Sequence, residues 1–129
     1  MAYHSFLSSN GTEILVGRDD AGNDELTFSI GRANDVWLHV SGVPGSHVLL
    51  RCGDARGFPD RTCLKEAASL AAWYSKMRRG GKVAVNWCRV RDVRKPRGAK
   101  AGSVTIRNEQ KLAVRPGFPP GVEPPESSD

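Results

Sequence analysis

DRTCLKEAASLAAWYSKMR, residues 60–78, is the stretch of sequence that predicts most about the fold of this chain. It contains no glycine or proline and is rich in alanine and leucine, which favour helices. Its apolar residues recur with helical spacing, at Leu64, Ala67, Ala68, Ala71 and Tyr74. Gly80 and Gly81 then end the pattern. The stretch predicts one long helix, whose alanine-rich face lets its backbone lie close to a sheet.

Apolar and β-prone runs before this helix predict strands. Residues 3–8 and 12–16 flank an Asn-Gly pair, which is a strong signal of a β-hairpin. Residues 36–40 and 47–50 are two compact apolar runs, separated by a turn that contains a Pro-Gly pair. We therefore expect four strands on the N-terminal side of the helix.

Further strands are predicted after the helix. Residues 82–91 alternate with the period of a strand. Residues 103–106 and 111–114 are expected to form two short strands. Residues 94–102 are basic, contain two glycines and are too poor in apolar residues for a core, so they predict a loop.

A short helix is predicted over residues 23–30. Asn23 is a capping residue type, acidic residues follow it, and Leu26 and Ile30 lie four positions apart. Together these elements predict an α+β fold, in which a mixed or antiparallel sheet packs with one long alanine-rich helix and one short helix.

Length and composition fit a single domain. The chain has 129 residues, of which 39% are hydrophobic and 26% are charged. Residues 116–129 hold five of the eight prolines and little that a core could bury. We expect a domain over residues 1–115, followed by a disordered, proline-rich and acidic tail over residues 116–129.

The net charge of +5 hides an uneven distribution. Residues 1–75 carry a net charge of −3, and residues 116–129 also carry −3. Residues 76–115 hold thirteen basic residues against two acidic ones, a net charge of +11. Such a segment is typical of a surface that binds a polyanion, and nucleic acid is the commonest polyanion inside cells. A solvated basic face that only confers solubility is the alternative.

The composition argues against several other classes. No apolar run approaches the roughly 20 residues that span a bilayer, and the N-terminus does not have the pattern of a signal peptide, so we expect a cytoplasmic protein without a membrane partner. Cys52, Cys63 and Cys88 are odd in number and contain no C-x-x-C pair. We therefore expect neither a disulfide framework nor a metal site nor a cofactor.

The densest group of polar and aromatic residues lies between Asp35 and Val48. On a strand, Asp35, Trp37 and His39 point to the same side. In one interpretation Trp37 stacks on a base, while the turn at Ser46 and the adjacent His47 contact a phosphate or a ribose. In the other, Trp37 belongs to the core and the turn merely reverses the chain.

The same residues admit an enzymatic interpretation. His39 and His47 together resemble the acid and base of a phosphodiesterase. However, the sequence supplies no convincing nucleophile and no set of metal-binding carboxylates. Catalysis is therefore the weaker hypothesis.

Several motifs, in this order, resemble the NFACT-R family of RNA-binding domains. They are Gly17-Arg18 with Asn23-Asp24, Asp35-x-Trp37-x-His39, Pro44-Gly45-Ser46-His47-Val48, Tyr74-Ser75 and Lys95-Pro96-x-Gly98-Ala99-Lys100-x-Gly102. The resemblance implies an α+β domain that contacts RNA. In long members of the family this domain belongs to a scaffold that binds the large ribosomal subunit and tRNA during rescue of stalled translation.

The resemblance also carries expectations for single residues. The positions that match family motifs are Gly17, Arg18, Asn23, Asp24, Asp35, Trp37, His39, Pro44, Gly45, Ser46, His47, Lys95 and Lys100. The family usually has Asn and Gln where this chain has Asp19 and Gly22, and the carboxylates of Asp19 and Asp20 repel phosphate. The chain is also too short for the other domains of long members, so we expect a standalone domain.

The sequence therefore predicts a non-catalytic, cytoplasmic domain that binds tRNA or ribosomal RNA, with the large ribosomal subunit as a possible partner. The alternatives are a DNA-binding protein, a His-dependent phosphodiesterase and a protein-interaction module that uses the tail. The predicted nucleic-acid-binding residues are Arg18, Asn23, Asp24, Trp37, His39, Ser46, His47, Lys82, Arg89, Arg91, Arg94, Lys95, Arg97 and Lys100.

Overall fold

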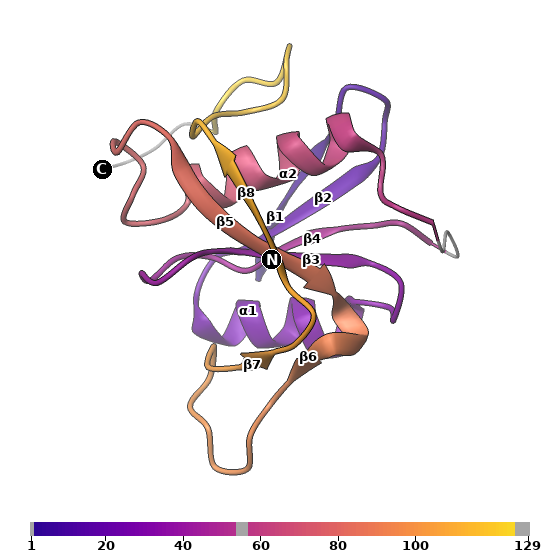
Figure 1. Cartoon of the computed structure of the whole chain (residues 1–129), viewed down its shortest axis with the longest axis vertical. Helices are drawn as coiled ribbons and strands as arrows, with labels where there is room; N and C mark the ends of the chain where they lie inside the picture. The colour runs from indigo at the N-terminus through magenta and orange to yellow at the C-terminus, as the bar shows by residue number, and fades with distance from the viewer. Residues whose placement is uncertain (1, 54–56, 126–129) are drawn as a thin grey trace.

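A computed structural model describes residues 2–53 and 57–125 and confirms the α+β fold (Figure 1). Six strands form an antiparallel sheet in the order β1-β2-β4-β3-β5-β8, and β6 pairs with β7 in a separate ribbon. The strands are β1 (Tyr3–Leu7), β2 (Glu13–Gly17), β3 (Val36–Val40), β4 (Val48–Leu50), β5 (Val83–Arg89), β6 (Val93–Arg94), β7 (Thr105–Ile106) and β8 (Gln110–Val114). The helical segments are α1 (Asp20–Glu25), the π-helical turn η1 (Leu26–Ile30), α2 (Arg61–Trp73) and the 3-10 turn η2 (Val90–Asp92). No helix within the described residues is long and apolar enough to cross a membrane.

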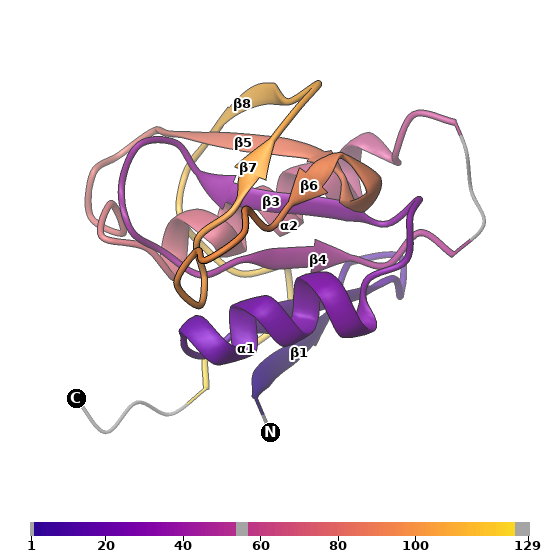
Figure 2. The same ribbon diagram turned by 90° about the horizontal axis from the view of Figure 1, so that it is seen from below.

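The two α-helices lie on opposite faces of the sheet (Figures 1 and 2). Alternate residues of the central strands form the core beneath α2, among them Leu38, Val85 and Trp87. The alanine face of α2, centred on Ala67 and Ala71, is completely buried against them. Small side chains let the helix backbone approach the sheet closely, as the sequence predicted.

Helix α2 ends earlier than the predicted 60–78. Its start is as expected, because the Asp60 side chain accepts a hydrogen bond from the Cys63 N–H at 2.9 Å and caps the helix. After Trp73, however, Ser75 forms an isolated β-bridge with Gly45. The end of the predicted helix was wrong because this tertiary pairing turns the last residues toward the β3–β4 loop.

The short helix begins earlier than the predicted 23–30. Asp19 caps it by accepting a hydrogen bond from the Gly22 N–H at 2.7 Å. Asn23, the predicted cap, is buried inside α1 and uses its side chain for a tertiary contact instead. In the following turn, Leu26 packs with Leu15 and Leu49 on the face of the sheet opposite α2.

A loop that we name the arm, residues 95–104, joins β6 to β7 and extends past α1 (Figure 1). The β6–β7 ribbon covers Trp37, which clusters with Cys88 and Val93 and is only 2% exposed. Trp37 therefore belongs to a small core on this face, and it is not available to stack on an RNA base in this conformation.

Residues after β8 continue to contact the domain. The Gly117 N–H donates a hydrogen bond to the Ser69 carbonyl at 3.1 Å. Phe118 packs edge-on against Phe6, Trp73 and Tyr74, with ring centroids 5.2–6.0 Å apart. The predicted boundary at residue 115 leaves these contacts outside the domain. The division into a domain and a tail stays a prediction, and residues 126–129 of that tail lie outside the described residues.

Candidate nucleic-acid interface

A set of polar contacts fixes the basic arm on helix α1. The Asp24 carboxylate forms an ion pair with Lys95 at 2.9 Å and accepts a hydrogen bond from the Gly102 N–H at 3.0 Å. The Lys95 ammonium also donates to the carbonyls of Ser103, at 3.1 Å, and Lys100. One lysine therefore closes the arm into a loop, and one carboxylate holds both ends of that loop.

Electrostatics agree with this arrangement. Burial raises the pKa of the Asp24 carboxyl, but the hydrogen bonds from Lys95 and Gly102 and the charge of Lys95 outweigh it and hold the pKa below its ordinary value. Asp24 is therefore charged at neutral pH, and its ion pair with Lys95 is maintained.

His47 provides the second attachment of the arm. Its Nε2 lies 3.1 Å from the Gly102 carbonyl oxygen, and its Nδ1 lies 3.0 Å from the Thr27 hydroxyl. Because a carbonyl can only accept, Nε2 carries the proton of the neutral ring. Nδ1 is then an acceptor that faces the Thr27 hydroxyl, whose single hydrogen is also directed at the Asn23 carbonyl at 2.8 Å. The backbone N–H of His47 donates to Oδ1 of Asn23 at 3.0 Å. Both ring nitrogens are thus occupied by the structure, which disfavours His47 as a catalytic acid or base.

We expect His47 to make the protein less stable in acid. Burial, and then the nearby charge of His39, lower the pKa of His47 from 6.5 to about 4. As the pH falls below 6.5, the unfolded chain takes up a proton that the folded protein does not bind until about pH 4. Stability is therefore fully present above pH 6.5 and falls between 6.5 and 4, by on the order of 3 kcal/mol. Urea unfolding of the wild type and of His47→Gln between pH 6.5 and 4 measures this loss of stability. If both proteins lost the same stability over this range, His47 would not be its cause.

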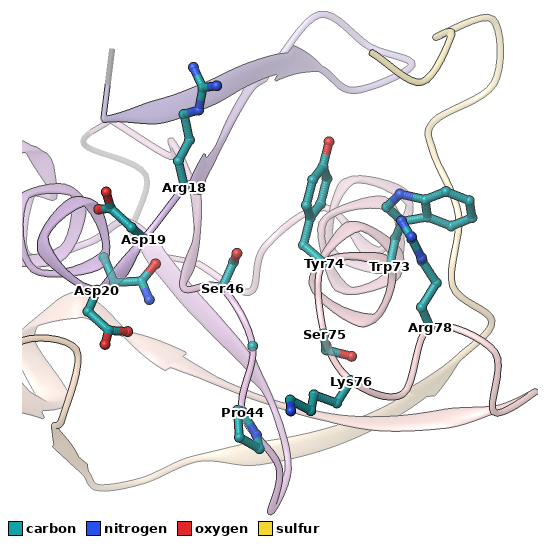
Figure 3. Close-up of a pocket in the computed structure, with 12 residues that line it drawn as sticks. Arg18, Asp19, Asp20, Pro44, Ser46, Trp73, Tyr74, Ser75, Lys76 and Arg78 are labelled. Atoms are coloured by element: carbon teal, nitrogen blue, oxygen red, sulfur yellow. The ribbon is translucent and has the colours of Figure 1, made fainter. Parts of the chain in front are cut away.

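An open pocket of about 430 Å³ lies between α1, the β3–β4 loop and the end of α2 (Figure 3). Arg18, Lys76 and Arg78 bring three cations to its lining, Ser46 and Ser75 bring hydroxyls, and Trp73 and Tyr74 bring aromatic rings. Asp19 and Asp20 line it from the side of α1. Its volume is within the range of ligand pockets, but its lining is more polar than is usual for a small-molecule site.

The arm adjoins this pocket. A Cβ placed on Gly102 would lie only 2.9 Å from Oδ1 of Asp20, so the arm backbone packs directly against a residue of the pocket wall. Arg97 and Lys100 of the arm are exposed, as are Arg18, Lys76 and Arg78. The structure therefore joins two cationic features, the arm and the pocket, along helix α1.

The other predicted site residues divide into groups by their surroundings. Arg94 and Lys82 are exposed, whereas His39 is half-buried and its ring lies 5.9 Å from that of Trp37. The Arg89 guanidinium donates to the carbonyls of Asn34, at 2.5 Å, and Gly57. Arg91 donates to the Asn34 side chain at 2.7 Å.

The structure separates two predicted contacts from the pocket. Arg89 is the last residue of β5. The basic loop over residues 74–82, which includes Lys76 and Arg78, leads from α2 into the other end of this strand, at Val83. A seven-residue strand spans about 20 Å. Arg89 and Arg91 therefore lie at the far end of the strand from Lys76 and Arg78.

Sequence reasoning missed the residues that the end of α2 contributes to the pocket. Trp73, Lys76 and Arg78 were not predicted as site residues, although Lys76 and Arg78 lie in the basic segment. The predicted helix continued through them, so they were expected on a regular helix surface. The signal that marks them is the aromatic pair Trp73-Tyr74, after which three basic residues occur within the four positions before Gly80.

Comparisons with known proteins agree with the RNA-binding interpretation. Residues 2–108 match the family model described as the NFACT protein RNA binding domain. The chain is 38% identical over 112 residues to the Rqc2 homolog RqcH of Bacillus subtilis, covering 87% of this chain and 19% of that protein. It is also 38% identical to the Rqc2 homolog RqcH of Streptococcus suis, of which it covers 20%. The C-terminal structure of the fibronectin/fibrinogen-binding protein of Streptococcus suis superposes with a TM-score of 0.84 at 36% identity, covering 91% of this chain and 46% of that one. The chain thus spans about a fifth of the curated relatives it matches.

Proposed function

Because the chain belongs to the family of NFACT RNA-binding domains, we propose that it binds RNA without catalysing a reaction and that the docked arm is its main contact. The observation that carries this proposal is the attachment of the arm to α1 through Asp24 and to the β3–β4 loop through His47. A loop held in one conformation loses little entropy on binding, so its cations contribute more of their attraction to affinity.

We further propose that the RNA is tRNA or ribosomal RNA, that the protein acts in ribosome quality control in the cytoplasm, and that the large ribosomal subunit is its partner. The relatives named Rqc2 homolog RqcH support the role in ribosome quality control. Among the predicted contacts, we retain Arg18, Ser46, Arg94, Arg97 and Lys100 as groups that touch RNA, with Lys82 as an outlying phosphate contact.

Other predicted residues act indirectly in this proposal. Lys95, Asp24, Asn23 and His47 position the arm, because their polar atoms are bonded within the protein. Trp37 and His39 support the ribbon from which the arm extends. Arg89 and Arg91 are assigned to holding the segment around Asn34.

The choice of RNA over duplex DNA is tested by competition. Labelled tRNA bound to the protein is challenged with unlabelled tRNA or with duplex DNA of equal total charge. We expect unlabelled tRNA to compete far better than duplex DNA. Phosphate contacts alone do not distinguish the two polymers, whereas contacts to the shape and the 2′-hydroxyls of folded RNA do. Stronger competition by DNA would reject the proposed function.

We expect the double variant Arg97→Gln/Lys100→Gln to weaken RNA binding and to make it less dependent on salt. Each phosphate contact that is lost lowers the slope of log affinity against log salt by about one, so the slope falls by about two. Fluorescence anisotropy with labelled tRNA at several salt concentrations measures both effects.

The matched control removes two exposed cations from the opposite face of the sheet, Arg61 and Lys65 of α2. Both double variants change the net charge by the same amount. If Arg61→Gln/Lys65→Gln lowered the affinity and the slope as much as the arm variant, binding would follow net charge and the arm would not be the contact.

A further inference from the structure

The pocket between α1 and the end of α2 has two walls of opposite charge. Lys76 and Arg78 come from the segment after α2, and Asp19 and Asp20 come from the start of α1 on the other side (Figure 3). A phosphate is attracted to the first wall and repelled from the second. The pocket therefore favours a ligand that carries an anion at one end and uncharged hydrogen-bond donors at the other.

Two arginines lie on either side of Tyr74 in the view of Figure 3. Burial raises the pKa of the Tyr74 phenol, and the charges of Arg78 and Arg18 oppose that rise. The Arg78 guanidinium also lies 4.7 Å from the centroid of the Trp73 ring. The pocket lining therefore receives positive charge from two separate parts of the chain, at Arg18 and at Arg78.

The floor of the pocket is fixed by backbone contacts. The Ser46 N–H donates to the Tyr74 carbonyl at 3.0 Å, and the Lys76 N–H donates to the Pro44 carbonyl at 3.2 Å. A Cβ on Gly45 would lie 2.9 Å from Cβ of Ser75, so only glycine allows the two segments to approach this closely. The Ser46 and Ser75 side chains thus occupy set positions between the two charged walls.

The acidic wall offers a free acceptor. Asp19 is committed to capping α1, because one of its oxygens accepts the Gly22 N–H. Asp20 is exposed and, within the described part of the chain, accepts no hydrogen bond. A carboxylate is a common partner for ribose hydroxyls in nucleotide sites.

We propose that this pocket binds one ribonucleotide unit of RNA, with a phosphate held by Lys76 of the basic wall and the 2′-hydroxyl donating to Asp20. The proposal rests on the proposed function, since it takes RNA as the partner. The 2′-hydroxyl is the group by which a protein distinguishes RNA from DNA. The pocket thereby adds selectivity for RNA to the affinity that the arm supplies.

The phosphate contact is tested by comparing two neighbouring cations. Lys76 lines the pocket and Arg79 does not, yet both are exposed and lie in the same loop. We expect Lys76→Gln to weaken the binding of labelled tRNA about fivefold and Arg79→Gln less than twofold. If the two variants weakened tRNA binding equally, the proposal that Lys76 contacts a phosphate in this pocket would be wrong. Thermal unfolding of each variant confirms that the fold is retained.

The 2′-hydroxyl contact is tested with matched single-stranded RNA and DNA oligonucleotides in which uracil is kept in both. The wild type is expected to prefer the RNA, and Asp20→Asn to reduce this preference by about tenfold. Asp20→Asn also removes a negative charge, but this affects both oligonucleotides equally because they carry the same number of phosphates. The ratio of RNA affinity to DNA affinity therefore reports the 2′-hydroxyl contact alone.

Two failures are distinguishable. If Asp20→Asn leaves the preference for RNA unchanged while tRNA binding through the arm persists, the pocket proposal is wrong and the proposed function stands. If wild-type protein binds neither tRNA nor the RNA oligonucleotide, the proposed function itself is wrong.

Discussion

Replacing Asp24 by alanine is expected to weaken RNA binding about tenfold, although it removes a negative charge from a protein that binds a polyanion. The reason is geometric. The Asp24 carboxylate holds Lys95 at 2.9 Å and the Gly102 N–H at 3.0 Å, so without it the arm loses its attachment to α1. A mobile arm must be ordered on binding, and that entropy is subtracted from affinity. Anisotropy with labelled tRNA measures the effect, and amide hydrogen exchange in the arm reports its release.

The control is Glu25→Ala on the exposed side of the same helix. It removes the same charge at the neighbouring position, so simple electrostatics predicts slightly tighter binding for both variants. Only attachment of the arm predicts effects of opposite sign. Tighter binding by Asp24→Ala would show that the arm does not depend on this carboxylate.

Replacing Gly17 by alanine is expected to destabilise the protein by about 3 kcal/mol. A Cβ at this position would lie 2.0 Å from Oδ1 of Asn23, which no van der Waals contact permits. Asn23 must then move, and its hydrogen bond from the buried His47 N–H is lost. The free energy of unfolding from urea titration, monitored by tryptophan fluorescence, measures the loss.

Gly117→Ala is the matched control, because a Cβ there meets no atom within 4 Å. We expect its free energy of unfolding to stay within about 0.5 kcal/mol of the wild type. A loss at Gly17 no larger than that at Gly117 would mean that the α1 segment shifts freely and that Asn23 does not fix the β3–β4 loop.

Local patterns were enough to predict most of the secondary structure. A compact apolar run at residues 36–40 and alternation in residues 82–91 predicted two central strands, and apolar residues of both strands form the core. The spacing of small residues around Ala67 and Ala71 predicted the helix that covers them. These patterns can be read from short stretches of sequence because the repeat of a helix or strand decides which of its residues point to the same side.

The ends of elements were less predictable. The bridge between Gly45 and Ser75 ends α2, and the tertiary contact of Asn23 moves the cap of α1 to Asp19. From the neighbouring sequence alone, Ser75 is an ordinary helix residue and Asn23 an ordinary capping residue. The partners lie about 20 to 30 positions away, so no sequence window around either residue contains the cause.

The sequence by itself determined the fold class, the family and the segment that carries the positive charge. It did so because hydrophobic period, motif order and formal charge are properties of the residues in their order along the chain. The tertiary structure alone decided what those residues do. His47 and Lys95, which are 48 positions apart, both hold the arm in its conformation, whereas Trp37 lies in a core cluster and Lys76 lines a pocket. A side chain contacts RNA or its own protein according to which groups the fold brings within hydrogen-bond distance, and that distance is set by packing across the sheet.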